Sequence, residues 1–188
     1  MLYILITAVC WCVFYGYWIW KARETKDNIY IQGLADIVIA RIWLIAVFAL
    51  LYFPQLSRGW LGIRILPKST ILGSTADVVC ALGVALSVWA RSILGQNWSG
   101  AVTIKKDHEI IMHGPYRAVR HPIYTGYLTA TLGSALAVGE VRGLIALVMI
   151  FAGIMRKLGI EEKLLGQHFP DTYSEYRKHT KKLIPFVL

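Results

Sequence analysis

The feature that most restricts the fold of this chain is a series of long apolar runs that contain almost no charge. The first, Leu2–Trp20, spans about nineteen uncharged residues, which is long enough to cross the hydrocarbon core of a bilayer. No basic segment precedes it, it exceeds the apolar region of a signal peptide, and aromatic residues fill its C-terminal end. We therefore interpret it as a membrane span and not as a cleaved leader.

The remaining apolar runs predict four further spans, the last two of which are short for a full crossing. We place them at Asp36–Phe53, Ile71–Leu94, Pro122–Val138 and Leu144–Leu158. The predicted fold is an all-α integral membrane protein with about five transmembrane helices. After the last span, Gly159–Leu188 is charged and aromatic, and we expect an amphipathic helix against the cytoplasmic face, with Ile184–Phe186 docking back.

The distribution of basic residues predicts the orientation of these spans. Of the 20 lysines and arginines, all but four fall in the loop between the first and second spans and in the other segments that lie on the same side of the membrane. The four exceptions are Arg58, Arg64, Lys68 and Arg142. Basic residues are concentrated on the cytoplasmic side of membrane proteins. We therefore expect the N-terminus outside, and the C-terminus together with any ligand site on the cytoplasmic side.

The composition excludes several other classes of protein. The three cysteines are Cys10, Cys12 and Cys80, all in apolar runs, so they predict neither a disulfide framework nor a redox pair. The net charge of +9 is explained by basic loops beside anionic lipid headgroups, and no nucleic-acid-binding module accompanies it. We do not expect a nucleic-acid partner.

The densest polar stretch is His113–Gly126, which places histidines, arginines, tyrosines and prolines between two apolar runs. Such groups cost stability in apolar surroundings unless they bind one another or a ligand. Within this stretch, Arg120–Tyr124 is typical of a loop that leads into a helix N-terminus, where free N–H groups suit a carboxylate or another anion. A basic collar beside the membrane also explains Arg117 and Arg120, but not the His-Pro-x-Tyr order.

The same region also contains side chains that can ligate a metal. Its ligands would be drawn from His108, His113 and His121, together with Glu161 or Glu162. No pair among them has the spacing that puts two ligands on one helical turn. We therefore expect no metal.

The order Gly-Pro-Tyr-x-x-x-Arg-His-Pro-x-Tyr-x-Gly at 114–126, followed by Glu161-Glu162 and then by Tyr173, Tyr176 and Pro185, resembles the isoprenylcysteine carboxyl methyltransferase family. The related membrane phospholipid methyltransferases share much of this pattern. The resemblance covers roughly the second half of the chain. With about five spans, the chain is similar to the compact prokaryotic members of the family, archaeal ones included.

The resemblance implies one membrane methyltransferase domain, 1–188, in which 1–95 contributes three spans and 96–188 binds S-adenosylmethionine and carries catalysis. In agreement, no Gly-x-Gly-x-x-Gly follows a strand. Lys157 matches the arginine that faces the substrate, with Arg156 beside it, and either is the implied catalytic residue. The implied cofactor-binding residues are Thr103, His108, Glu109, Ile110, Ile111, Tyr116, His121, Pro122, Ile123, Tyr124 and Glu161.

The implied reaction is carboxyl O-methylation of a lipophilic, isoprenylcysteine-type acceptor that reaches the site from the bilayer. A carboxylate is ionised at neutral pH, so this reaction requires alignment and exclusion of water but no general base. N-methylation of a phospholipid amine is the alternative with the same cofactor, and it requires a base such as Glu162 or a histidine. A NADPH-dependent membrane reductase and a non-enzymatic channel or transporter also remain open. A channel would have charged residues distributed along its spans, whereas here they are concentrated at the predicted cytoplasmic face, which disfavours a channel.

Overall fold

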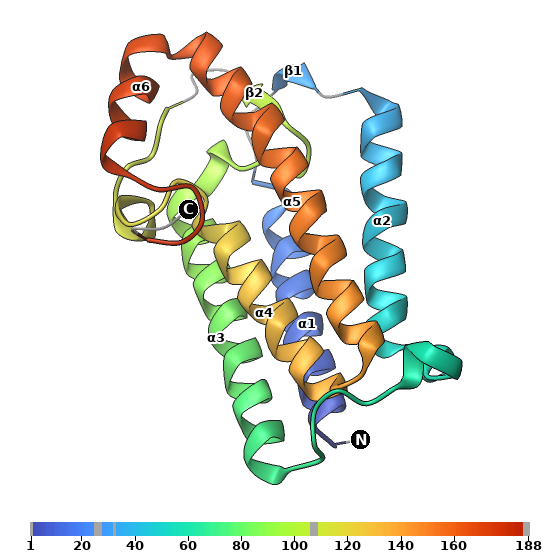
Figure 1. Ribbon diagram of the computed structural model, residues 1–188. Helices are drawn as coiled ribbons and strands as arrows, with labels where there is room; N and C mark the ends of the chain where they lie inside the picture. The colour runs from blue at the N-terminus through green and yellow to red at the C-terminus, as the bar shows by residue number, and fades with distance from the viewer. Residues whose placement is uncertain (1, 25–27, 32, 106–108, 186–188) are drawn as a thin grey trace.

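The computed structural model describes residues 2–24, 28–31, 33–105 and 109–185 and forms a bundle of long helices (Figure 1). The helices are α1 (Leu2–Lys21), α2 (Leu34–Tyr52), α3 (Thr70–Leu94), α4 (Pro122–Val138), α5 (Val141–His168) and α6 (Pro170–His179). Short 3-10 helices lie at Pro54–Leu56, Gly59–Gly62, Gly95–Asn97 and Gly114–Arg117. The predicted all-helical class is confirmed.

In the described part of the chain, α1, α2, α3 and α5 are long and apolar enough to cross a membrane. The large apolar side chains on their outer faces, such as Leu5, Ile42 and Val78, are more than half exposed. In water such a surface would aggregate, whereas in a bilayer it faces lipid. The molecule is therefore an integral membrane protein. The fourth predicted span forms α4, a 17-residue helix in the centre of the bundle.

The polar region after the fifth span folds differently from the sequence prediction. The helix that contains the span predicted at Leu144–Leu158 continues to His168, so α5 extends beyond its apolar part. Phe169 then leaves the helical conformation, and Pro170 begins the separate helix α6. The predicted C-terminal amphipathic helix is present as α6, but it is shorter than predicted: residues 159–168 belong to α5, and the separate helix covers Pro170–His179.

Two short strands form that the sequence did not predict. Strand β1 (Asn28–Ile31) pairs antiparallel with β2 (Thr103–Lys105). This pairing joins the connection between α1 and α2 to the long connector between α3 and α4. Because it contains so few residues, it leaves no recognisable alternating pattern in the sequence.

The closest helix packing is between α3 and α4, where glycines bring the two backbones together. A Cβ atom at Gly83 would lie 2.3 Å from the backbone nitrogen of Ala130, and one at Gly126 would lie 2.5 Å from the carbonyl oxygen of Gly83. The Ser87 hydroxyl adds a hydrogen bond of 3.1 Å to the carbonyl oxygen of Ile123. Small residues at such an interface allow van der Waals contact along both helices, as expected for membrane bundles.

Helix α2 lies at the side of the bundle and packs mainly along α5 (Figure 1). Near the C-terminal end of α2, the buried Arg142 of α5 donates hydrogen bonds of 2.6 Å and 3.2 Å to the carbonyl oxygens of Leu50 and Leu51. The last carbonyl groups of a helix have no hydrogen-bond partner within the helix, and these two are among them. The guanidinium therefore fastens the end of α2 to the beginning of α5. The opposite half of α2 borders the cavity described next.

Candidate functional site

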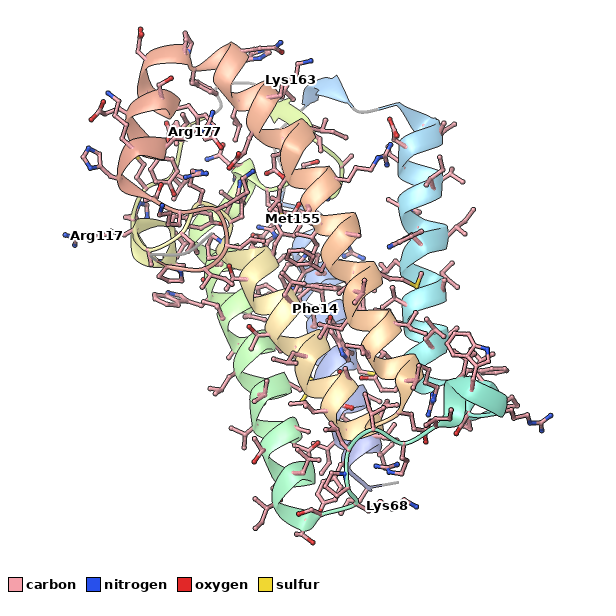
Figure 2. The ribbon with its side chains drawn as sticks, in the orientation of Figure 1. Phe14, Lys68, Arg117, Met155, Lys163 and Arg177 are labelled. Carbon is pink, nitrogen blue, oxygen red and sulfur yellow. The ribbon has the colours of Figure 1, made fainter. Side chains whose placement is uncertain are left out.

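A cavity of about 810 Å³ lies between α1, α2, α4 and α5 and is covered by the α3–α4 connector and α6. Its walls change in character along its length. Polar and charged side chains gather where the connector and α6 cover it, and apolar and aromatic side chains line its inner part. In Figure 2, Arg117, Lys163 and Arg177 mark the covered end of the molecule, Phe14 lies within the bundle, and Lys68 marks the opposite end. This division suits a ligand with a polar and an apolar part.

Beside the polar end, the carboxylate of Glu162 is surrounded by basic groups. Its Oε1 atom lies 2.9 Å from Nη2 of Arg120 and 3.3 Å from Nε2 of His121, and its Oε2 atom lies 3.1 Å from Nζ of Lys182. Glu162, Arg120 and His121 are all buried. A buried carboxylate of this kind is stable only because its partners compensate its charge. The carboxylate of Glu162, on α5, therefore partly neutralises the basic cluster that the sequence indicated around Arg120.

The C-terminal segment of the chain is fastened to the same cluster. The backbone N–H groups of Arg120 and His121 donate to the carbonyl oxygens of Lys181 and Lys182 at 2.8 Å and 3.1 Å. The Arg120 guanidinium also donates to the carbonyl oxygen of Thr180. Leu183 is buried, whereas Ile184 is half exposed. The tail is held by these backbone hydrogen bonds and by Leu183, and not by the predicted segment: Ile184 and Pro185 are exposed, and Phe186 lies outside the described residues.

One residue before Glu162 on α5, Glu161 faces the cavity. Its Oε2 atom accepts a hydrogen bond of 3.3 Å from the Tyr124 hydroxyl. Lys157, one turn earlier, donates a hydrogen bond of 2.8 Å to the carbonyl oxygen of Gly100, and its ammonium lies 5.5 Å from the centre of the Tyr124 ring. A carboxylate, a phenol and an ammonium therefore meet at the boundary between the polar and the apolar part of the cavity.

Three tyrosines from the connector and α6 also line the polar end. The Tyr176 hydroxyl donates to the carbonyl oxygen of Tyr116 at 2.6 Å, and the Tyr116 hydroxyl donates to that of Ala90 at 3.3 Å. Burial raises the pKa of Tyr176 to about 12 and raises the pKa values of Tyr116 and Tyr173 as well. At neutral pH these hydroxyls are protonated, and since those of Tyr176 and Tyr116 already donate to carbonyl oxygens, the hydroxyl of Tyr173 is the one of the three that can donate to a ligand.

Some buried polar oxygens in the cavity wall have no hydrogen-bond partner among the described residues. They include Oδ1 of Asn97 and Oγ1 of Thr103, both on the connector. An unpaired buried polar atom costs free energy, and such atoms are rare in folded proteins. Their position in the wall makes them available to a polar ligand.

The structure brings most of the predicted site residues to this one cavity. The cavity is lined by Thr103, Glu109, Ile110, Ile111, Tyr116, His121, Ile123, Tyr124, Arg156, Lys157 and Glu161. Pro122 does not line it, because it is buried in the first turn of α4. His108 lies outside the described residues.

The two candidate catalytic residues have different surroundings. Lys157 is directed to the interior, as described above. Arg156 lies at the surface, with 58% of its side chain exposed, and its Nη2 atom lies 2.6 Å from Oδ1 of Asp36 on α2. The geometry therefore distinguishes a basic residue inside the cavity from one at its rim.

The cavity also contains residues that were not predicted to line it. Asn97 and Trp98 come from the connector, Arg120 lies in the predicted motif, and Tyr173 and Tyr176 belong to α6. The spacing of the two tyrosines, which puts them on one helical face, was the available signal for α6. The N-terminal helices contribute mainly aromatic and apolar residues, which are indistinguishable in the sequence from lipid-facing side chains: Phe14, Tyr15, Trp18, Ile37, Trp43 and Leu44.

Within the described ranges, no group of three or more histidines, cysteines, aspartates or glutamates is arranged to hold a metal ion. The histidine of the site, His121, is instead engaged with Glu162.

Comparison with known proteins identifies relatives that match across this region. The family model described as phospholipid methyltransferase matches residues 72–172, which include most of the site. The protein-S-isoprenylcysteine O-methyltransferase of Schizosaccharomyces pombe is 33% identical over 109 residues, covering 56% of this chain and 46% of the relative. Protein-S-isoprenylcysteine O-methyltransferase B of Arabidopsis thaliana is 24% identical over 145 residues, covering 73% and 66%.

A solved structure is also similar. It is that of the eukaryotic intramembrane Ras methyltransferase, isoprenylcysteine carboxyl methyltransferase, with a TM-score of 0.57 and 25% sequence identity, and the match covers 84% of this chain and 55% of that one. The chain thus spans about half the length of the yeast relative and of this solved structure.

Proposed function

The chain belongs to the phospholipid methyltransferase family, and from this premise we propose that it is a membrane methyltransferase that uses S-adenosylmethionine to methylate the carboxylate of an isoprenylcysteine-type acceptor. The observation that carries the proposal is the division of a single cavity into a polar part and an apolar part, with Lys157, Tyr124 and Glu161 at the boundary. The names of the relatives support the choice of reaction.

The residues at the polar end fit S-adenosylmethionine, whose amino-acid end, ribose and adenine need different partners. Glu161 offers a carboxylate to an ammonium or a ribose hydroxyl, and the unpaired oxygens of Asn97 and Thr103 offer acceptors to an amino group. Ile110 and Ile111 provide an apolar wall for the base. When bound, S-adenosylmethionine supplies an electrophilic methyl group on a sulfonium.

The basic residues of the cavity fit an acceptor carboxylate. Lys157 lies at the boundary between the two parts, and Arg41 and Arg156 line the same cavity from α2 and α5. A cation there orients the carboxylate without protonating it, and the acceptor needs no base because it is already ionised at neutral pH. The surrounding apolar wall excludes water from the reacting groups.

The engagement of Glu162 favours this reaction over N-methylation of a phospholipid amine. A protonated amine must lose its proton before it attacks, and Glu162 was a candidate base for that step. Its oxygens already accept from Arg120 and Lys182, which stabilise the ionised form and make the carboxylate a poor proton acceptor. The cations that line the cavity also repel an ammonium group.

We also propose that the N-terminus is outside and that the cofactor site and C-terminus are cytoplasmic. The distribution of lysines and arginines supports this orientation, since they are concentrated on the side of the polar end of the cavity. A soluble cofactor then reaches the polar end from the cytosol. Because α2 packs mainly along α5, the acceptor's chain reaches the apolar part from the bilayer beside α2.

The experiment is methyl transfer from S-adenosylmethionine labelled in its methyl group, with N-acetyl-S-farnesylcysteine as the acceptor and detergent-purified protein. We expect labelled product whose label is released by alkali, because a methyl ester is hydrolysed and an N-methyl group is not. Label that alkali does not release, obtained with phosphatidylethanolamine as the acceptor, would replace this proposal with the amine reaction. A change of Lys157 to Met serves as the inactive control for the acceptor side.

A further inference from the structure

The cavity ends inside the bundle, and its lining stops at a similar depth on each of the four surrounding helices. The innermost lining residues are Phe14 on α1, Leu44 on α2, Tyr127 on α4 and Ile150 on α5. The next inward-facing residues, such as Trp11 and Ala146, are buried and do not line the cavity. The cavity therefore has a floor inside the bundle and does not continue through it.

Aromatic rings form this floor. The hydroxyls of Tyr15 and Tyr127 lie 2.9 Å apart and link α1 to α4. The Phe14 ring stacks on Trp18 with centroids 3.9 Å apart and meets Tyr127 edge-on at 5.4 Å. Rings packed in these arrangements are stiff, and each contact adds to the stability of the cluster. Figure 2 shows Phe14 at the centre of the bundle, below Met155.

The layer beneath the floor is packed around Ser134, and its hydrogen bonds are satisfied. The Ser134 hydroxyl accepts from the Trp11 indole and from the Tyr52 hydroxyl, each at 2.9 Å, and donates to the carbonyl oxygen of Ala130 at 3.0 Å. Trp11 also meets Tyr127 with centroids 4.7 Å apart. Polar groups satisfied in this way inside a membrane are costly to separate. The floor is thus supported from below by a packed layer whose polar groups are paired.

We propose that Phe14 and Tyr127 limit the length of the acceptor's hydrocarbon chain, an inference that rests on the proposed function. About 10 Å of helix rise separates Lys157, beside the reacting carboxylate, from Ile150 at the floor, at about 1.5 Å per residue. The cavity of about 810 Å³ must hold the cofactor as well as this chain. Each methylene that fits should strengthen binding about fourfold, and a chain that meets the floor should gain nothing more.

These two residues belong to different parts of the chain. Tyr127 lies within the segment matched by the family model, 72–172, whereas Phe14 lies outside it. Chain-length selection would therefore depend partly on an N-terminal helix that the family pattern does not describe.

The test measures the dissociation constants of N-acetylcysteine thioethers that carry geranyl, farnesyl or geranylgeranyl chains, with methyl transfer recorded in parallel. The variants are Tyr127→Ala and the milder Tyr127→Leu, which retains more packing if the first does not purify. Tyr127→Phe keeps the ring and removes only the hydrogen bond to Tyr15. Phe48→Ala is a matched control, because Phe48 packs on Trp11 at 5.0 Å without lining the cavity.

For the wild-type protein we expect affinity to rise with chain length and then to level off or fall at the longest chain. Tyr127→Ala and Tyr127→Leu should shift the ratio of dissociation constants toward the longest chain by on the order of tenfold. Tyr127→Phe and Phe48→Ala should keep the wild-type ratio. A ratio unchanged in both floor variants would overturn the inference, because the chain would then leave the cavity sideways into the bilayer.

The two readouts separate this inference from the proposed function. If binding follows chain length as expected but no methyl group is transferred, the floor limits the ligand and the proposed reaction is wrong. If methyl transfer occurs with no dependence on chain length in any variant, the reaction stands and the floor has no such role.

Discussion

The carboxylate of Glu162 lies 2.9 Å from the guanidinium of Arg120, and only 7% of each side chain is exposed. Arg120 precedes α4, Glu162 is on α5, and both contact the C-terminal segment, through Thr180 and Lys182. One ion pair therefore joins three segments that are far apart in the sequence. It also supports the wall of the cavity, since Arg120 lines it.

A change of Glu162 to Gln should destabilise the protein by about 3 kcal/mol, because it leaves Arg120 buried without a compensating charge. The measurement is thermal unfolding in detergent. Glu175→Gln is the matched control, since Glu175 forms its ion pairs with Lys178 and His179 on the exposed face of α6. Equal unfolding temperatures for the two variants would show that the Glu162 cluster does not stabilise the fold.

The turn between α4 and α5 should give stability a specific dependence on pH. Burial raises the pKa of Glu140, but hydrogen bonds from Arg142 and Ser57 outweigh it and hold the pKa below the ordinary 4.5. A carboxyl with a lowered pKa in the folded state stabilises the protein above the unfolded pKa, and this contribution is lost as the pH falls through the folded pKa.

The wild-type protein should therefore unfold at a higher temperature than Glu140→Gln at neutral pH, and the difference should shrink as the pH is lowered below about 4.5. Thermal unfolding at a series of pH values measures this. A difference that stays constant down to the most acid pH would mean that ionised Glu140 contributes nothing.

Lys157 and Arg156 should respond differently to neutral substitutions. Under the proposed function, Lys157→Met should reduce methyl transfer at saturating acceptor by at least about tenfold, because it removes the interior cation proposed to orient the carboxylate. Arg156→Met should change mainly the KM of the acceptor, since Arg156 is exposed and paired with Asp36. Steady-state kinetics of both variants provide the test. The reverse assignment would follow if Arg156→Met lost turnover and Lys157→Met did not.

Much of the fold could be predicted from the sequence because each span is a long apolar run bounded by charge or proline. Leu2–Trp20 and Ile71–Leu94 agree with α1 and α3 to within about one residue. The fifth span was predicted to end at Leu158, but the helix that contains it is longer, for a physical reason. A helix does not end where hydropathy falls: α5 continues to His168 and ends only before Pro170.

The residues of the candidate site could be predicted where they belong to a compact sequence motif. They could not be predicted where only helix packing brings them to the cavity. Tyr116, His121 and Tyr124 occur within nine residues of one motif, and all three line the cavity. Trp18 and Trp43 line it too, but an aromatic residue in a span gives no indication of whether it faces lipid or a cavity. The pairing of Arg156 with Asp36, across most of the chain, has no local signal at all.

The most direct test of the central claim is calorimetric titration of the detergent-purified protein with S-adenosylhomocysteine, and separately with NADPH. We expect saturable binding of S-adenosylhomocysteine and at least about tenfold weaker binding in Glu161→Gln, because a hydrogen bond to a charged group is lost. Glu175→Gln, on the exposed face of α6, should bind as the wild type does. Binding of NADPH but not of S-adenosylhomocysteine would contradict the account and identify a reductase.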